Sequence, residues 1–255
     1  MPIAYARRLT GPTRTAQANR QLGFALAFVA GAINAGGFLA VQQYTSHMTG
    51  IVSSMADGVA LGTYGLVLTG AGALLAFLAG AATSAVMVNY ARRHALQSEY
   101  ALPLLLEAVL LLGFGLLGAQ LSRIEGLLVP LTAIWLCFIM GLQNAVVTKL
   151  SNAEVRTTHI TGIVTDIGIE LGKLAYWNWG HGVAGAPPPV RADPRRLTVL
   201  VTLVLCFFGG GVVGAVGFRH LGYAATLPLA LLLIVLAGVP AIDDLRVWLR
   251  RRPLG

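Results

Sequence analysis

Charged residues are scarce in this chain: Asp, Glu, Lys and Arg together make up 11% of it, while hydrophobic residues make up 56%. This imbalance excludes an ordinary soluble domain, in which about a quarter of the residues are charged. Several apolar stretches reach the roughly 20 residues that a helix needs to cross about 30 Å of hydrocarbon. The composition therefore predicts an all-α integral membrane protein.

Cysteine is rare as well, and the two that are present, Cys137 and Cys206, both lie inside apolar stretches. This placement is typical of small buried hydrophobic residues rather than of a disulfide. The sequence also lacks a P-loop, a Gly-x-Gly-x-x-Gly turn after a strand, a His-Glu-x-x-His helix and a Cys-x-x-Cys pair. We therefore expect no enzymatic activity, no cofactor and no metal site.

Six apolar stretches are long enough to be transmembrane helices. If the N-terminus is cytoplasmic, 16 of the 18 Lys and Arg residues fall on the cytoplasmic side, and only Arg123 and Arg219 fall outside. The positive-inside rule then predicts a multi-pass membrane protein with both termini in the cytoplasm. Anionic lipid headgroups account for the net charge of +8, without nucleic acid. The predicted spans are 22–41, 66–90, 101–121, 127–147, 197–218 and 222–242.

Two copies of one phrase reveal a duplication. The first phrase, Thr-Ser-His-Met-Thr-Gly-Ile-Val, occupies residues 45–52, and the second, Thr-Thr-His-Ile-Thr-Gly-Ile-Val, occupies residues 157–164. A Gly-x-x-Asn-Ala motif precedes each. Because each half holds three spans, the second half would enter the membrane from the opposite face, as in many transporters. We expect basic tails at 1–20 and 246–255, three-helix repeats at 21–125 and 126–245, and a cytoplasmic insertion at 177–196.

The phrases are poor sequences for lipid-facing helices. We predict that Thr49-Gly50 and Thr161-Gly162 start short half-helices over 51–61 and 163–176, with the threonines as caps. The free N–H groups would then point back toward His47 and His159. Interrupted helices at matching places of two inverted halves are typical of a transport site. The alternative is a surface turn that satisfies its own backbone.

We expect substrate contacts from both phrases and from two amides inside spans. Those amides could instead hold helices together, and each histidine could have a purely structural hydrogen-bonding role. The candidate substrate-binding residues are Asn34, Thr45, His47, Thr49, Gly50, Asn144, Thr158, His159, Thr161 and Gly162.

Three acids are candidates for coupling. Asp57 and Asp166 follow the two phrases by one or two helical turns. Glu107 lies deep inside an apolar run, and Leu232 stands at the aligned position of the second half. Acids in or near membrane helices are functional candidates by default.

These motifs resemble the YoaK-type family of bacterial inner-membrane proteins, a family of unknown function with about six predicted spans, over about residues 20–245. The second half matches the family pattern Gly-x-Gln-Asn-Ala and Thr-Thr-x-x-Thr-Gly closely. The first half departs twice, because Asn34 stands where an acid is usual and Ile51 where Asn is usual. If the acid couples transport in relatives, Glu107 or Asp57 would have to replace it here. The resemblance implies a fold and no substrate.

The leading hypothesis is a transporter or permease for a small polar or anionic solute, with its pathway between the two halves. Its partners would be that solute and a bilayer with anionic headgroups on the cytoplasmic side, and a homo-oligomer is compatible with the sequence. The alternative is a non-transporting membrane protein, either a scaffold that binds a partner or a membrane-embedded enzyme.

Overall fold

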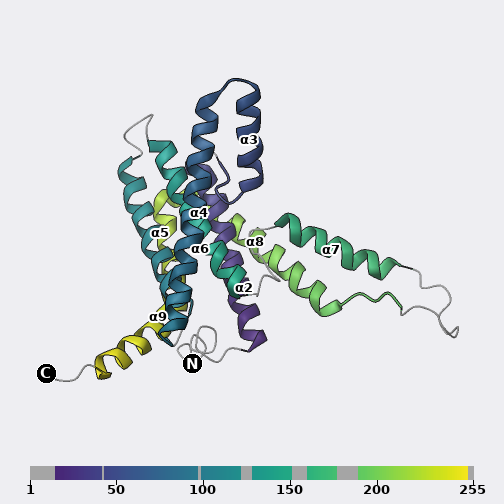
Figure 1. The fold of residues 1–255 in the computed structure, drawn as a ribbon, viewed down its shortest axis with the longest axis vertical. Coiled ribbons are helices and arrows are strands. Elements are labelled where there is room, and N and C mark those ends of the chain that lie inside the picture. The colour runs from purple at the N-terminus through teal and green to yellow at the C-terminus, as the bar shows by residue number, and fades with distance from the viewer. Residues whose placement is uncertain are drawn as a thin grey trace.

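The computed structural model describes residues 15–41, 43–96, 99–121, 128–150, 160–176 and 189–251, and this part of the chain is helical without any strand (Figure 1). The helices are α2 (Ala16–Val41), α3 (Met48–Ala60), α4 (Tyr64–Arg93), α5 (Ala101–Leu121), α6 (Leu128–Leu150), α7 (Ile160–Ala175), α8 (Pro194–Leu221), the short 3-10 helix η1 (Gly222–Ala225) and α9 (Thr226–Arg251).

Five stretches of the described chain are long and apolar enough to cross a membrane. The last of them is 45 residues long and contains α8, η1 and the first half of α9. The prediction of an all-helical membrane protein is therefore confirmed. The five stretches are Ala16–Leu39, Tyr64–Arg93, Ala101–Gly118, Leu131–Lys149 and Pro194–Gly238.

Several helices extend beyond the predicted apolar stretches. α2 begins at Ala16 and α9 continues to Arg251, so both enter segments predicted as tails. α8 begins at Pro194, inside the predicted 177–196 insertion, of which residues 177–188 lie outside the described part. Asp193 caps this helix, since its Oδ1 accepts hydrogen bonds from the backbone N–H groups of Arg195 and Arg196. Hydropathy alone does not predict these helical turns, because they contain arginine, which is hydrophilic but favours the helix.

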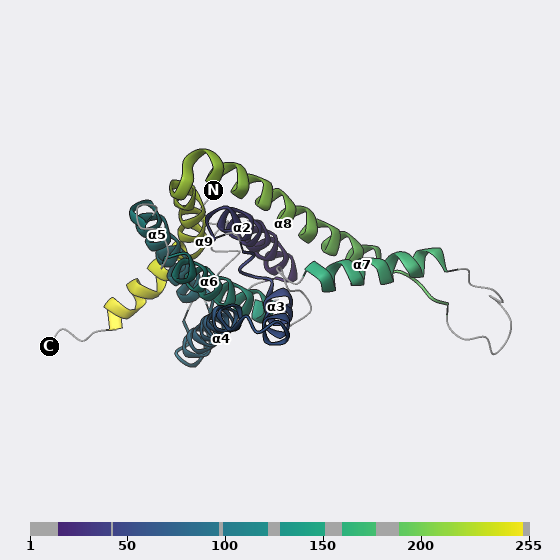
Figure 2. The same cartoon turned by 90° about the horizontal axis from the view of Figure 1, so that it is seen from above.

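Four glycines allow the long helices to cross at backbone contact. α2 packs along α8, α4 packs along α6, and α5 packs against α9 (Figure 2). A Cβ atom at any of the four would overlap a carbonyl of the facing helix, so only glycine permits this approach. Gly31 lies against the carbonyl of Phe207, Gly210 against Phe28, Gly80 against Phe138 and Gly141 against Phe77.

The two crossings correspond residue by residue through the duplication. Gly141 is the counterpart of Gly31, since each opens the Gly-x-x-Asn-Ala motif of its half, and Phe138 precedes Gly141 as Phe28 precedes Gly31. On the other two helices Gly210 takes the place of Gly80, because each meets the carbonyl of the corresponding phenylalanine. The first helix of each half, α2 or α6, therefore packs against the helix that follows the short helix of the other half, α8 or α4.

α3 is held by a small apolar cluster between α4 and α6. Ile51, in the first turns of α3, packs with Ala73 and Ala76 of α4 and with Cys137 of α6, which is a free thiol. α3 is only 13 residues long and ends in a tight turn before α4. The cluster that holds α3 therefore contains residues of both halves, with α4 from the first half and α6 from the second.

α7 is held in the equivalent way between α8 and α2. Ile163, the counterpart of Ile51 in the second phrase, packs with Leu200 and Leu203 of α8 and with Ala27 of α2. Cys206, also a free thiol, lies at the edge of this cluster. The predicted cysteine environments are confirmed, since both thiols pack among apolar side chains.

Candidate functional site

The loop between α2 and α3 carries the first phrase and is tied to α2 by Asn34. The Asn34 Oδ1 atom accepts hydrogen bonds from the Ser46 backbone N–H at 3.2 Å and from the Ser46 hydroxyl at 2.9 Å. The amide predicted to line the pathway therefore positions the phrase. Its NH₂ group makes no hydrogen bond to a described residue, so it remains available as a donor.

Thr45 is fully buried, and its hydroxyl has no hydrogen-bond partner among the described residues. A buried hydroxyl without a partner costs free energy because it has lost its bonds to water. The arrangement is therefore incomplete as it stands.

α3 begins at Met48, three residues earlier than predicted, and the predicted threonine cap is wrong. His47 occupies the N-cap position with no side-chain cap, and its carbonyl accepts the first helical hydrogen bond from Ile51 at 3.1 Å. Thr49 is exposed in the first turn, where its backbone is already helical. The N–H groups of Thr49 and Gly50 consequently donate to no described residue.

The His47 ring lies over Gly50. A Cβ atom on Gly50 would overlap the imidazole, at Cδ2 and at Nε2. Residues three apart are neighbours on a helical turn, which explains the His-x-x-Gly spacing of the phrase. The histidine is exposed. Gly50 therefore sets the position of an accessible imidazole beside the uncapped helix end.

The second phrase is described only from Ile160 onward, so Thr158 and His159 lie outside the described residues. α7 begins at Ile160, again three residues before the predicted start at 163, with Thr161 exposed and Gly162 half-buried in its first turn. On α6, the Asn144 Nδ2 atom donates to the Met140 carbonyl of its own helix at 3.0 Å.

The first turns of α3 and α7 both begin near the middle of the bundle. Ala73, which packs against α3, lies seven residues before Gly80, about 10 Å along the helix axis. Leu203 beside α7 lies seven residues before Gly210, at about the same distance. In Figures 1 and 2 the two short helices run outward from this region in different directions.

The three candidate coupling acids have different surroundings. Asp57 is exposed on α3. Asp166 on α7 forms an ion pair with Arg196 at 3.1 Å. Glu107 on α5 is fully buried, and neither of its carboxylate oxygens has a partner among the described residues.

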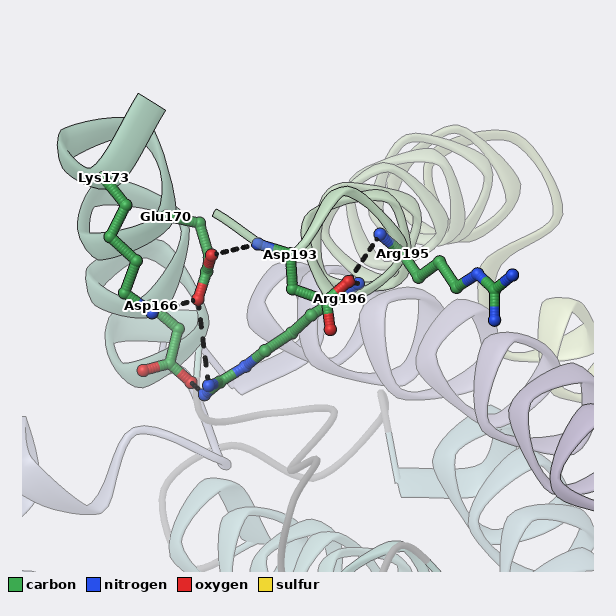
Figure 3. Close-up of polar contacts among 6 residues, drawn as sticks. All are labelled: Asp166, Glu170, Lys173, Asp193, Arg195 and Arg196. Carbon is green, nitrogen blue, oxygen red and sulfur yellow. Dashed lines mark hydrogen bonds and ion pairs between the residues drawn. The ribbon is translucent and has the colours of Figure 1, made fainter. Parts of the chain in front are cut away.

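Glu170 lies at the centre of a polar network between α7 and α8 (Figure 3). Its side chain is 1% exposed and accepts hydrogen bonds from Lys173 Nζ and from the Asp193 backbone N–H, each at 2.8 Å. Arg196 lies 3.9 Å away. The hydrogen bond from Lys173, followed by that from Asp193, lowers the pKa of Glu170. This network connects α7 to α8, and it includes Asp166, one of the three predicted coupling acids, through Arg196.

Two further polar contacts connect helices, and neither was predicted from the sequence. The Gln143 Nε2 atom on α6 donates to the Leu26 carbonyl on α2 at 3.4 Å, while its Oε1 atom has no partner among the described residues. Lys149 Nζ donates to Asn89 Oδ1 on α4 at 2.9 Å. The Gln-Asn pair of the motif was the available signal for the first contact, whereas nothing in the sequence indicated the second.

In the described part of the chain, no group of three or more His, Cys, Asp and Glu side chains could hold a metal ion. No curated protein and no solved structure matches the chain. Residues 22–239 match a family described as "protein of unknown function (DUF1275)", which includes the YoaK-type proteins. Because the match covers most of the sequence, the protein belongs to this family of unknown function.

Proposed function

We propose that this protein is a permease for a small polar or anionic solute. The observation that carries the proposal is the uncapped start of α3, where the N–H groups of Thr49 and Gly50 donate to no described residue. The loop that leads into this start contains Thr45, whose hydroxyl has no described partner, and Ser46, which is hydrogen-bonded to Asn34. Helix N-termini attract negative charge because their N–H groups and dipoles point outward. All these groups can donate hydrogen bonds, which favours an anion or a solute rich in acceptors.

The proposed architecture has six spans in two inverted halves. Contacts advance together along α2 and α8, from Phe28 with Gly210 to Ala32 with Gly214, so these helices run parallel. The same holds for α4 and α6, where Gly72 faces Ile134 and Gly80 faces Phe138. Six alternating crossings require these directions, because α2 and α8 would be the first and fifth spans and α4 and α6 the second and fourth.

The starts of α3 and α7 would then lie within the membrane on opposite sides of its midplane. The half-helix of each repeat points its N-terminus toward the glycine crossings, and irregular backbone at this depth is tolerated only where it lines a cavity or protein interior. We place the solute pathway between these two ends. Thr158, His159, Thr161 and Gly162 would complete it from the second half.

The orientation is part of the proposal, with both termini in the cytoplasm of a bacterial cell and the chain in its cytoplasmic membrane. Alkaline phosphatase fused after the C-terminus should be inactive, because the enzyme requires export to fold. The same reporter inserted beside Arg123 should be active. The opposite pattern would reverse the proposed orientation, and activity at both sites would contradict the six-span count.

The transport proposal is tested by flux into vesicles that contain the purified full-length protein. Chloride, inorganic phosphate, acetate and neutral glycerol serve as probes. We expect flux of at least one probe, and its loss in the double variant His47→Ala/His159→Ala. The matched control is His94→Ala/His220→Ala, since both of these histidines are exposed at helix ends away from the phrases. Equal flux in the two double variants would overturn the site, and flux no higher than in empty vesicles would contradict transport of these probes.

A further inference from the structure

Glu107 lies about two turns after the start of α5, in the line of buried positions that includes Leu104, Ala108 and Leu111. The side chain is fully buried, and both carboxylate oxygens lack a hydrogen-bond partner among the described residues. An ionised carboxylate is very unfavourable in such surroundings, because no donor or cation of the described residues replaces its hydration. The described arrangement of helices is therefore compatible with a neutral carboxylic acid.

Among the acids whose side chains the structure describes, this environment is unique to Glu107. Asp57 on α3 is exposed. The remaining described acids all have partners that stabilise the charged form. Glu99 pairs with Arg92, Asp166 with Arg196 and Glu170 with Lys173, while Asp193 accepts two N–H groups of α8.

The helices packed against α5 supply no described positive partner. On α6, Cys137 faces the α3 cluster and Lys149 binds Asn89. On η1, the Tyr223 ring contacts Phe114 edge-on. The other titratable groups of α4 lie in its first and last turns, and those of α9 all follow Ile242, where the side chains are not described. These are Tyr64, Tyr90, Arg92 and Arg93 on α4, and Asp243, Asp244, Arg246, Arg250 and Arg251 on α9.

The duplication shows that packing does not require an acid at this position. The aligned residue of the second half is Leu232 on α9, which packs against the same central core. α5 and α9 lie side by side, so the two equivalent positions belong to one interface. A leucine would fill the volume without the cost of a buried polar group. An acid in this place points to a role in function, as intramembrane acids generally do.

We propose that Glu107 binds and releases the proton that couples solute movement to the proton gradient, an inference that rests on the proposed permease function. The carboxylate takes up one proton to give the neutral acid, and no other bond forms or breaks. The neutral acid is the form that the buried site described above favours. Release of the proton requires a second arrangement, in which water or a donor reaches the carboxylate. A ligand or proton shifts such an equilibrium only through its different affinity for the two states.

The test is infrared difference spectroscopy on the full-length protein in lipid vesicles, which detects the C=O stretch of a protonated carboxyl. We expect a band at neutral pH that is absent from Glu107→Gln and present in the matched control Asp57→Asn. It should disappear reversibly when the medium is made alkaline. Absence of the band at neutral pH would overturn the proposal, and so would a band that persists until the protein unfolds, because that acid never releases its proton.

Flux measurements separate this inference from the permease proposal. In vesicles with an imposed pH gradient, wild type should accumulate whichever of chloride or phosphate it transports, while Glu107→Gln should only equilibrate it. Accumulation by Glu107→Gln equal to that of wild type would overturn coupling and leave the permease intact. Without flux of any probe in wild type, the infrared titration still decides whether Glu107 exchanges a proton. If Glu107→Gln fails to fold, Glu107→Asp should keep the band at a shifted frequency, and an unchanged spectrum would refute the assignment.

Discussion

The Glu170 carboxylate accepts a hydrogen bond at 2.8 Å from the backbone N–H of Asp193, the residue that caps α8. α7 is thereby fixed to the start of α8. In the first half the equivalent position is Gly58, which is buried where a Cβ atom would lie 3.0 Å from Val67 and 3.3 Å from the Thr63 carbonyl. Close packing joins α3 to α4, and a charged network joins α7 to α8.

Glu170→Gln should lower the thermal stability of the α7–α8 hairpin at neutral pH. Glutamine keeps an acceptor for the Asp193 N–H but loses the charge that attracts Lys173. Limited proteolysis within residues 177–188 should become faster, which gel electrophoresis can follow. Asp57→Asn is the control, because this exposed acid has no described partner. Equal cleavage rates for wild type and Glu170→Gln would contradict the role of the network.

The Glu170→Gln variant also predicts the direction in which thermal stability depends on pH. The pKa of Glu170 is lowered from the ordinary value of 4.5, first by Lys173 and then by the Asp193 N–H. Its contribution is therefore complete above the ordinary pKa and is lost as the pH falls through the lowered one. The difference in melting temperature between wild type and Glu170→Gln should be constant near neutrality and shrink in acid. A difference that grows in acid would contradict this.

Gly210→Ala should destabilise the bundle by about 1–3 kcal/mol, the usual cost of overpacking. The new Cβ atom would overlap the Phe28 carbonyl, so α2 and α8 would have to separate. Gly209→Ala is a closely matched control, because a Cβ atom there would have nothing within 4 Å. Unfolding in mixed detergent micelles gives the two free energies. Equal effects of the adjacent substitutions would mean that the crossing does not depend on glycine.

Asn34→Asp should retain the loop before α3, whereas Asn34→Ala should release it. A carboxylate can accept the same two hydrogen bonds from Ser46, while alanine loses both, at about 1 kcal/mol each. A cysteine introduced at Ser46 could not report the state of the loop by its reactivity, because the substitution would remove the partner of Asn34. Exchange of the backbone amide hydrogens of residues 43–47 reports it instead, and this exchange should accelerate only in Asn34→Ala. Acceleration in both variants would contradict the interpretation.

Gly50→Ala should displace His47 and reduce solute flux without unfolding the protein. The displacement follows from the overlap of the new Cβ atom with the imidazole ring. Gly65→Ala serves as the control, because this glycine of the first turn of α4 has nothing within 4 Å of its Cβ position. The rate of His47 modification by diethyl pyrocarbonate reports its surroundings directly. An unchanged rate in Gly50→Ala would show that the ring does not depend on Gly50.

Part of the site was predictable because it is local. The repetition of the phrase, the short helices after each copy and the environments of Cys137 and Cys206 all follow from residue order and hydropathy. The starts of α3 and α7 were predicted three residues late, since cap preferences were applied to Thr49 and Thr161. The cap predictions are wrong because Thr49 and Thr161 already have helical backbone, whereas a cap residue stands before the first helical residue.

The sequence by itself determined the membrane class, the duplication and the family, because composition and repeats require no knowledge of contacts between distant residues. Only the tertiary structure decided which polar groups are paired. Asp57, Glu107 and Asp166 were equal candidates in the sequence, and burial together with the position of Arg196 separated them. The interleaving of the two halves likewise depends on Gly31 meeting α8 and Gly141 meeting α4. Such contacts join residues far apart in the chain, and no local pattern encodes them.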